Sequence, residues 1–407
     1  MFRTFKTVAV AAVMLLAGVF GAANAADVTP DDTARFLAGM MPSADSPLTA
    51  LTRDPAWQRH ARFFDSAFTQ LDQRQISKVR AWSDANVAAP KPTMFYMFSG
   101  PDFLYANAFY PKATTYVLSA LEPPGSVPDL TKVSHGGVGA ALSNVEHSLN
   151  SILSFSFFIT KKMKTDLHEG QLDGALPLLY VFMARSGMTI KNVSAVALDE
   201  KGNAFFANEN VGTNATRGVR IVFAGSDGVE KTLYYFSTDL SDSGVRSSGF
   251  LKFCATLAPG NSLIKSASYL MHFGSFSTVR DFILANSATV IQDDSGIPLG
   301  YYSPRKWRFL PFGRYAGPID RFPGRYQPSY AELFHRAQPM DFGIGYRWRS
   351  YESNLLLSVR VPDDGSVTAD ATSTTESLPP LPKPKRPHKP KPSLPPPEPQ
   401  RGFFWFR

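Results

Sequence analysis

Residues 94–125 constrain the fold most, because their local pattern specifies a complete supersecondary unit. Residues 94–98 form an apolar run that is followed by a turn at 99–102, which supplies the proline and the acidic residue favoured at a helix start. A proline then ends the helix, and the β-branched and aromatic run 114–121 stops at Glu122. This order predicts a strand, a helix and a second strand.

A connection of this length that carries a helix joins parallel strands, so the 99–102 turn and Glu122 should emerge at the same edge of the sheet. The order of features resembles the first half of a Rossmann-like nucleotide or S-adenosylmethionine site, in which the acid after the second strand, Glu122, would hold ribose hydroxyls. Only Gly100 stands in the turn, where such sites usually have two or three glycines. The alternative is ordinary packing and turn chemistry.

A second unit of the same kind is predicted near residue 280. A strand over 263–271 would end at His272, a helix would cover 275–285, and a strand over 289–292 would stop at Asp293. Asp227-Gly228 lies between two further strand patterns and predicts a hairpin. The expected fold is α/β, with a mixed, mostly parallel sheet flanked by helices in a Rossmann-like three-layer arrangement.

If both units share one sheet, polar residues collect along one rim. Acidic and imidazole side chains there could bind a divalent cation or perform acid–base chemistry. Asp and Glu are equally ordinary at turns and caps, so this structural role stays open as the alternative. The candidate rim residues are Ser99, Asp102, Glu122, His272, Asp293 and Asp294, and the last three are the candidate metal ligands.

The chain divides by texture into a helical N-terminal cap over 26–92 and an α/β core over 93–362. Within the core, residues 301–351 contain 14 aromatic residues and eight arginines. Arginine beside aromatic rings can bind glycans, phosphates or single-stranded nucleic acid. We favour an irregular wrap over the core, with guanidinium groups stacked on rings and strands closing the sheet at 342–351 and 355–361.

The N-terminus predicts export. Residues 1–25 have two basic residues, an apolar run and an A-x-A pattern before Ala26, which is typical of a cleaved secretory signal peptide. The expected location is therefore periplasmic or secreted, with no transmembrane segment in the mature chain. Cys254 is the only cysteine, so no internal disulfide can form, and it is expected to be a buried core residue.

The C-terminal sequence predicts a segment that is separate from the folded core. Residues 363–378 have the composition of a flexible linker, and 379–407 form a disordered Pro/Lys-rich tail with an aromatic end. Residues 26–377 hold 33 basic and 33 acidic residues, so the positive net charge arises outside them and no nucleic-acid partner is expected. The tail's cations favour a cell-envelope polymer or anionic lipid as partner.

The stretches FSGPDFLYANAFYP, QDDSGIP and FGIGYRW together resemble a family of exported bacterial proteins of uncharacterised function. No nucleophile elbow, zinc spacing, P-loop or multi-glycine fingerprint is present. Two function classes follow. The first is a non-catalytic binding or envelope-associated protein, and the second is a hydrolase or transferase that uses the acidic rim.

Overall fold

The computed structural model describes residues 27–132, 135–155, 172–206 and 215–362. The signal peptide, the linker and the Pro/Lys-rich tail predicted from the sequence lie outside the described residues. Helices and strands alternate along the described chain, which confirms the α/β class.

A ten-stranded mixed sheet forms the centre of the described chain, with the order β4-β3-β5-β6-β2-β1-β7-β8-β10-β9. The strands are β1 (Thr93–Tyr96), β2 (Thr115–Ala120), β3 (Thr189–Leu198), β4 (Ala204–Phe206), β5 (Thr216–Ala224), β6 (Glu230–Ser237), β7 (Gly260–Ile264), β8 (Ser287–Gln292), β9 (Trp307–Gly313) and β10 (Asn354–Arg360).

Parallel pairing is confined to the five central strands, β6, β2, β1, β7 and β8. On one side β5, β3 and β4 continue the sheet with antiparallel pairs, and on the other side β10 and β9 do the same. The expectation of a mostly parallel sheet therefore holds at the centre and not at the edges. The reason is that the edge strands on the β3 side follow one another through short connections, which favour antiparallel neighbours.

The first predicted unit is confirmed. β1 and β2 are parallel, with Phe95 opposite Val117, and the buried helix α4 (Phe103–Phe109) joins them. Asp102 caps α4 by accepting a hydrogen bond from the backbone N–H of Tyr105 at 3.1 Å. Gly100 has φ +57°, a conformation that glycine adopts without steric cost, so the turn between strand and helix is as sharp as its composition predicts.

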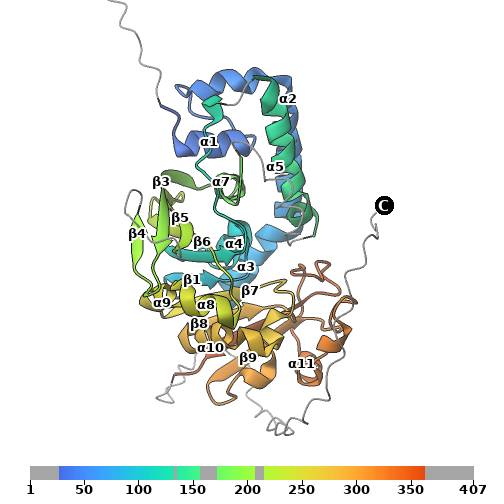
Figure 1. The fold of residues 1–407 in the computed structure, drawn as a ribbon. Helices are drawn as coiled ribbons and strands as arrows, with labels where there is room; N and C mark the ends of the chain where they lie inside the picture. The colour runs from blue at the N-terminus through green and yellow to red at the C-terminus, as the bar shows by residue number, and fades with distance from the viewer. Residues whose placement is uncertain (1–26, 133–134, 156–171, 207–214, 363–407) are drawn as a thin grey trace, which may run out of the picture.

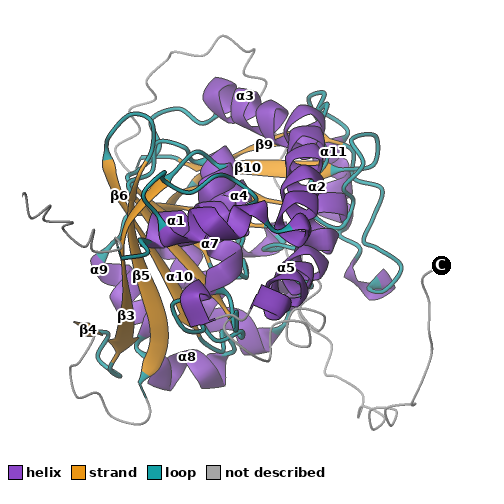
Figure 2. Cartoon of the chain, turned by 90° about the horizontal axis from the view of Figure 1, so that it is seen from above, coloured by secondary structure: helices purple, strands orange, loops and turns teal. Residues whose placement is uncertain are grey.

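The two faces of the sheet bury two different cores. Met94 and Tyr96 of β1 pack into one, and their neighbours Phe95 and Met97 pack into the other, as the alternation of side chains along a strand requires. The first core is covered by α1 (Pro30–Leu37), α2 (Pro55–Leu71), α3 (Ser77–Asn86), α4, α5 (His135–Phe155) and α7 (Leu176–Arg185). The second is covered by α8 (Asp242–Ser248), α9 (Phe250–Thr256) and α10 (Ser277–Asn286). Figure 2 shows these helices around the sheet.

The helices predicted for the N-terminal region are present. After α1 come a 3₁₀ helix (Pro47–Arg53) and then α2, whose last turn passes through a π-helical segment (Asp72–Ile76) into α3. In Figure 1, α1, α2 and α5 gather at one end of the molecule. Helix α5 packs on α2, and α1 packs on α7 and β3, so this group is anchored to the sheet through α1.

Two predicted strands are wrong. The strand expected over 263–271 is β7, which already ends at Ile264, because three residues of left-handed conformation (Ser266, Ser268 and Tyr269) turn the chain away from the sheet. The strand expected over 342–351 is a tight loop with a single bridge between Ile344 and Arg347. Its Gly345 has φ +68°, which breaks an extended conformation.

The aromatic and arginine-rich segment is partly regular, because it contains β9 and helix α11 (Pro328–Phe334). Its arginines stack on rings as expected: the guanidinium of Arg325 lies 3.9 Å from the ring centre of Phe273, and that of Arg349 lies 4.9 Å from Trp348. Arg347 forms an ion pair with Glu352 at 3.7 Å. Three of the eight arginines, Arg325, Arg347 and Arg349, are therefore seen to be engaged within the protein.

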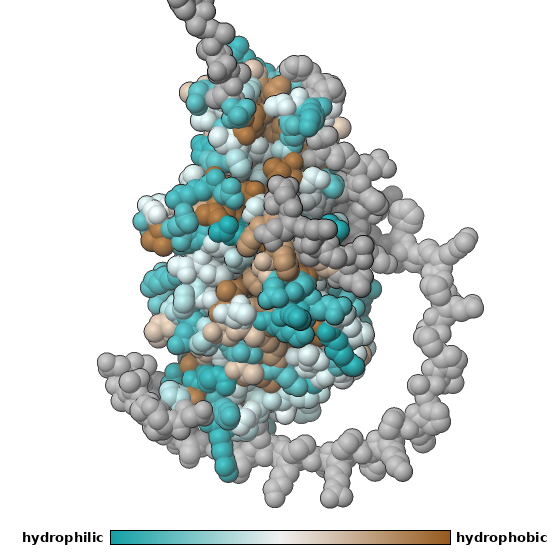
Figure 3. All heavy atoms as spheres, turned by 60° about the vertical axis from the view of Figure 1, so that its left-hand side comes forward, coloured by the Kyte–Doolittle hydropathy of each residue, from teal (hydrophilic) through white to brown (hydrophobic). Residues whose placement is uncertain are grey.

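Hydrophilic and hydrophobic residues alternate over the face shown in Figure 3, as on an ordinary solvent-facing surface. Within the described ranges, none of the helices combines the length and the apolar character that crossing a bilayer requires.

Candidate functional site at the rim of the central sheet

A cavity of about 200 Å³ lies at the carboxyl ends of the central strands, and we call it the rim pocket. Its wall is formed by the segments that follow β1, β2, β6 and β7, which are residues 96–100, 120–122, 238–240 and 265–268. Asp102, Leu270 and Phe276 complete it. The carboxyl ends of four parallel strands thus border one cavity, and open α/β sheets bind ligands at this edge.

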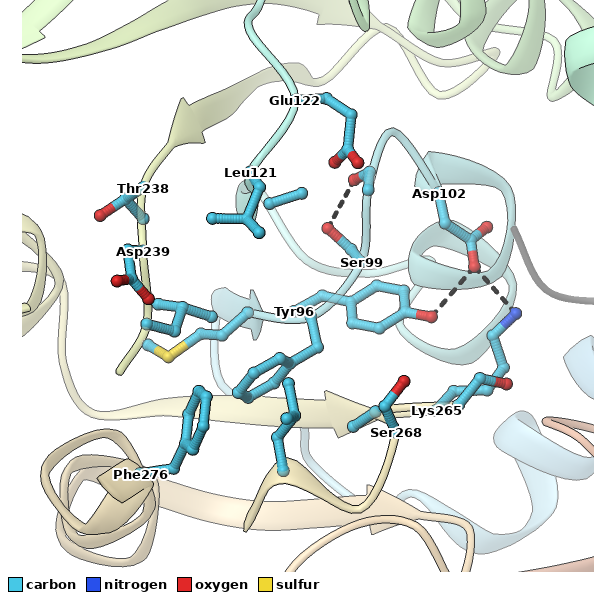
Figure 4. A pocket seen from close by; sticks show the side chains of 18 residues that line it. Tyr96, Ser99, Asp102, Leu121, Glu122, Thr238, Asp239, Lys265, Ser268 and Phe276 are labelled. Carbon is cyan, nitrogen blue, oxygen red and sulfur yellow. Dashed lines mark hydrogen bonds and ion pairs between the residues drawn. The ribbon is translucent and has the colours of Figure 1, made fainter. Parts of the chain in front are cut away.

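A buried ion pair is part of the wall of the rim pocket. The ammonium nitrogen of Lys265 lies 2.9 Å from Oδ2 of Asp102, and both side chains are at most 2% exposed. The hydroxyl of Tyr96 donates to the same oxygen at 3.0 Å, as Figure 4 shows, and the Lys265 ammonium lies 3.7 Å from the ring centre of Tyr105. Burial lowers the pKa of Lys265, and the nearby Asp102 carboxylate opposes that shift.

Tyr96 stays a hydrogen-bond donor in this network. Burial raises its pKa well above the usual range, and the Asp102 carboxylate raises it further. The Asp102 carboxylate therefore receives three interactions, from Lys265, Tyr96 and the backbone of Tyr105. This network fixes the start of α4 relative to β1 and β7.

Ser99 and Glu122 lie together on another part of the wall, as the sequence predicts (Figure 4). The hydroxyl of Ser99 donates to the backbone oxygen of Gly100 at 2.6 Å, and its N–H donates to Ser119 at 3.2 Å. Glu122 is 5% exposed, and its backbone oxygen accepts a hydrogen bond from Tyr235 at 2.9 Å. Both pocket residues are thus held by neighbouring strands.

The loop after β7 is strained where it meets the rim pocket. Ser266, Ser268 and Tyr269 have φ between +50° and +55°, a conformation that costs non-glycine residues free energy. Hydrogen bonds hold the loop in place: the N–H of Ser266 donates to Asp293 at 2.9 Å, and the hydroxyl of Ser268 pairs with Tyr346 at 2.8 Å. Strain of this kind concentrates at binding and catalytic sites.

Asp293 and Asp294 do not line the rim pocket; they hold the strained loop. Asp293 accepts hydrogen bonds from the backbone of Ser266 and from the backbone and hydroxyl of Ser295. Asp294 accepts from Tyr269 at 2.6 Å and from Asn354 at 3.0 Å. Burial and the neighbouring Asp294 raise the pKa of Asp293 to about 7, and burial also raises the pKa of Asp294.

His272 also lies away from the rim pocket. Because β7 ends at Ile264, the chain reaches His272 only after further turns, in a 3₁₀ segment (Leu270–His272). There its ring packs edge-on against Tyr269, with the ring centres 5.2 Å apart. Burial and the cation of Arg325 lower the pKa of His272 to about 4, so the ring is neutral near pH 7.

The six candidate residues therefore divide into two groups. Ser99, Asp102 and Glu122 share the rim pocket, and Asp293, Asp294 and His272 belong to the support behind it. In the part of the chain that the structure describes, no three His, Cys, Asp or Glu side chains are grouped as ligands of one metal ion. Cys254 is buried, with its pKa raised well above the usual range by burial.

Sequence reasoning missed Lys265 and Tyr96. A usable signal was present for Lys265, since a lysine directly after the run Ser262-Leu263-Ile264 is a charge at the end of a buried strand. Such a charge needs a partner, because an unpaired buried ammonium is unstable. Tyr96 carries no comparable signal, because tyrosine is common in strands.

No protein-family model, curated protein or solved structure matches the chain.

Proposed function

We propose that this protein binds a small organic ligand with ribose-like neighbouring hydroxyl groups in the rim pocket. The observation that carries the proposal is the meeting of Ser99, Gly100, Asp102 and Glu122 in one cavity at the ends of β1 and β2. The cavity volume of about 200 Å³ is below the ~300–1,000 Å³ typical of sites that enclose drug-sized ligands. A compact molecule, or one end of a larger one, suits it best.

The topology supports this proposal. β2 and β6 lie on one side of β1, and β7 and β8 lie on the other, so the direction in which strands are added reverses between β1 and β7. The connecting helix α4 packs in one core and α10 in the other. We interpret the five central strands as a Rossmann-like doubly wound sheet, in which ligands bind at the reversal point. The rim pocket includes the ends of both β1 and β7.

The polar groups of the wall support a ligand that donates hydrogen bonds. The Lys265 cation is already paired with Asp102, which leaves the carboxylates of Glu122 and Asp239 as the remaining charges of the wall. Asp239 is committed to capping the turn before α8, where it accepts hydrogen bonds from the backbone and hydroxyl of Ser241. Glu122 follows β2 and lies beside Ser99 on the pocket wall, which is where neighbouring hydroxyls of a ligand could meet a carboxylate, and Leu121 and Leu240 supply apolar contact.

The test replaces Glu122 by Gln. Adenosine, S-adenosylmethionine and ribose serve as probes in calorimetry, and 2′-deoxyadenosine is the analogue that lacks one hydroxyl. We expect at least one ribose compound to bind, and the substitution to weaken it at least ~10-fold, because a hydrogen bond to a charged group contributes about 1.5–3 kcal/mol. Removing the 2′-hydroxyl should weaken binding to a similar degree.

The matched control is Glu200→Gln, which removes an exposed acid in the turn between β3 and β4. It should leave affinity unchanged, and circular dichroism should show both variants folded. Equal affinity of the Glu122 variant and the original protein, or no binding of any ribose compound, would contradict the proposal.

A second candidate function is a hydrolase or transferase that works in the same pocket. The observation that favours it is the buried Lys265, with its lowered pKa, on the pocket wall beside the strained loop. Mass spectrometry of any bound probe after prolonged incubation separates the two classes. Unchanged probe supports the binding protein, and a product that disappears with Lys265→Met supports the enzyme.

We further propose that the protein acts outside the cytoplasm, in contact with the cell envelope, and that it belongs to the exported family that its three stretches resemble. The composition of residues 1–25 and 379–407 supports export and envelope contact. The three stretches also lie in related places: 98–111 borders the rim pocket, and 292–298 contacts 342–348 where Asp293 meets Gly345.

Deleting residues 378–407 should leave the melting temperature unchanged and reduce salt-sensitive association with envelope fractions. The deletion removes seven basic residues and one acidic residue, so the lost interaction is chiefly electrostatic. Sedimentation with envelope fractions at low and high salt measures it. A lower melting temperature of the truncated protein would show instead that the tail docks on its own domain.

A further inference from the structure

The wall of the rim pocket has a polar side and an apolar side, and the division follows the two faces of the sheet. Tyr96 of β1 packs in the first core, and Met97, the next residue, packs in the second. Lys265 pairs with Asp102 beside Tyr96, so these polar groups lie on the first face. Phe276 packs against the second core, and Figure 4 shows it well away from the Lys265–Asp102 pair. A ligand in the pocket therefore meets polar groups on one side and hydrocarbon on the other.

The apolar side of the wall leaves part of its surface uncovered. The rings of Phe98 and Phe276 lie with their centres 6.2 Å apart and their planes at 53°, and both side chains are half-buried. Leu121, the residue directly after β2, is 58% exposed although it lines the pocket, and Leu240 adds to the same wall. Covering such a surface with a flat apolar group lowers the free energy of the complex, because apolar area leaves water and ring contacts form.

The charge of the lining opposes an anionic ligand. Within the described part of the chain, the charged lining residues are the three acids Asp102, Glu122 and Asp239 and one lysine, Lys265. That lysine is already committed to Asp102 at 2.9 Å. The wall therefore carries a net negative charge, and a phosphate group placed in the pocket would be repelled by it.

The place where a nucleotide would put its phosphate is filled by the protein itself. In doubly wound sheets that bind nucleotides, the phosphate lies at the N-terminus of the helix that follows the first strand. Here that helix is α4, and the Asp102 carboxylate occupies its N-terminus by accepting the N–H of Tyr105 at 3.1 Å. Tyr96 and Lys265 hold the carboxylate there, and Asp102 is 1% exposed. A buried side-chain anion thus takes the position of the phosphate.

We propose that the rim pocket binds an uncharged nucleoside, with its base against Phe98 and Phe276 and its sugar toward Ser99 and Glu122, and that it rejects the corresponding nucleotide. The inference rests on the function proposed above, because it gives the sugar hydroxyls the same polar side of the wall. It adds a contact for the base and the exclusion of phosphate, which ribose binding alone does not imply. The cavity volume of about 200 Å³ also suits a single nucleoside better than a dinucleotide.

The test compares four probes by calorimetry with the full chain at one ionic strength: adenosine, adenosine 5′-monophosphate, ribose and 5′-methylthioadenosine. We expect adenosine to bind at least ~10-fold more tightly than the monophosphate, because the phosphate meets the negative wall. It should also bind at least ~10-fold more tightly than ribose, which has no base to cover the apolar side. The methylthio compound carries an uncharged group at the 5′ position, so it should bind within about threefold of adenosine if charge rather than size excludes the phosphate.

Two substitutions test the contact with the base. Phe276→Ala should weaken adenosine at least ~10-fold and leave the affinity for ribose unchanged, because only the base reaches this ring. Leu121→Ala should also weaken adenosine, and it truncates a side chain that is 58% exposed, so the variant tests the wall even where Phe276→Ala unfolds. Phe273→Ala is the matched control, since this exposed phenylalanine precedes Phe276 in the chain and does not line the pocket. Circular dichroism checks that each variant is folded.

The outcomes separate this inference from the ribose site on which it rests. The inference is overturned, and the ribose site stands, if the monophosphate or ribose binds as tightly as adenosine, or if neither Phe276→Ala nor Leu121→Ala weakens adenosine. Binding of 5′-methylthioadenosine as weak as that of the monophosphate overturns the exclusion by charge. If adenosine depends on Phe276 and not on Glu122, the base contact is right and the ribose contact is wrong. Failure of all four probes to bind at millimolar concentration overturns both.

Discussion

Asp102→Ala should destabilise the fold by about 3–5 kcal/mol, because it leaves the Lys265 ammonium buried without its carboxylate. The two groups are 2.9 Å apart and at most 2% exposed, so water cannot replace the lost partner. The substitution also removes the acceptor for the Tyr96 hydroxyl and the cap of α4. Urea unfolding followed by circular dichroism measures the loss.

A substitution at a second aspartate distinguishes the contribution of the buried ion pair from that of the helix cap. Asp54 caps α2 by accepting a hydrogen bond from the backbone of Ala56 at 2.7 Å, and it is only half-buried. Asp54→Ala should therefore cost about 1 kcal/mol, the usual value for a lost N-cap. Adding Lys265→Met to Asp102→Ala should restore part of the stability, because the uncompensated charge is then gone. Equal losses for Asp102→Ala and Asp54→Ala would show that the ion pair contributes nothing.

Asp293→Asn should lower stability and, in addition, change its dependence on pH. In the folded protein burial and Asp294 raise the pKa of Asp293 to about 7, so the fold binds this proton more tightly than the unfolded chain does. The resulting stabilisation is complete below the unfolded pKa of about 4 and is lost as the pH rises through about 7. Asparagine cannot titrate, so the variant lacks this decline.

His272 changes the stability with pH in the opposite direction, over a pH range that overlaps that of Asp293. Its pKa is lowered to about 4, so its contribution to stability is present above its unfolded pKa of about 6.5 and is lost as the pH falls. The measurement is therefore the difference in unfolding free energy between the original protein and Asp293→Asn at matched pH values. That difference should shrink as the pH rises from about 4 to about 7.

The free energy of unfolding should also fall by about 1–3 kcal/mol. The Asp293 carboxylate accepts hydrogen bonds from the N–H groups of Ser266 and Ser295, and the amide of Asn would place an N–H donor where one of these acceptors now lies. The sequence alone predicts instead that replacing Asp293 and Asp294 by Asn removes a ligand site and leaves the fold intact. Because of the hydrogen bonds to Ser266 and Ser295, we expect a loss of stability as well. Two curves that stay parallel at all pH values would show that folding leaves the pKa of Asp293 unchanged.

Several parts of the fold could be predicted because their causes are local. The β1–α4–β2 unit follows from an apolar run, a turn with Gly100 and a capping acid at Asp102, and the β5–β6 hairpin follows from Asp227-Gly228. Each of these patterns fixes backbone conformation within a few residues. The parallel direction of β1 and β2 then follows from the length of their connection, without knowledge of the rest of the chain.

The composition of the rim pocket depended on the tertiary structure. Sequence placed Ser99, Asp102 and Glu122 at the correct edge, because strand direction alone decides that. It could not place His272, because three residues in a left-handed conformation end β7 early, and non-glycine residues adopt that conformation only when long-range hydrogen bonds impose it. The same bonds turn Asp293 and Asp294 from site candidates into supports.

The pairing of Lys265 with Asp102 also could not be predicted from the local sequence pattern. Asp102 precedes it by more than 160 residues, and the two meet only because β1 and β7 are neighbours in the sheet. The sequence determined the β1–α4–β2 unit, the β5–β6 hairpin, the mixed character of the sheet and the edge where polar side chains gather. Tertiary structure decided which of those side chains face a cavity and which are used up as buried hydrogen-bond partners, because burial and partner distance arise only when distant segments pack together.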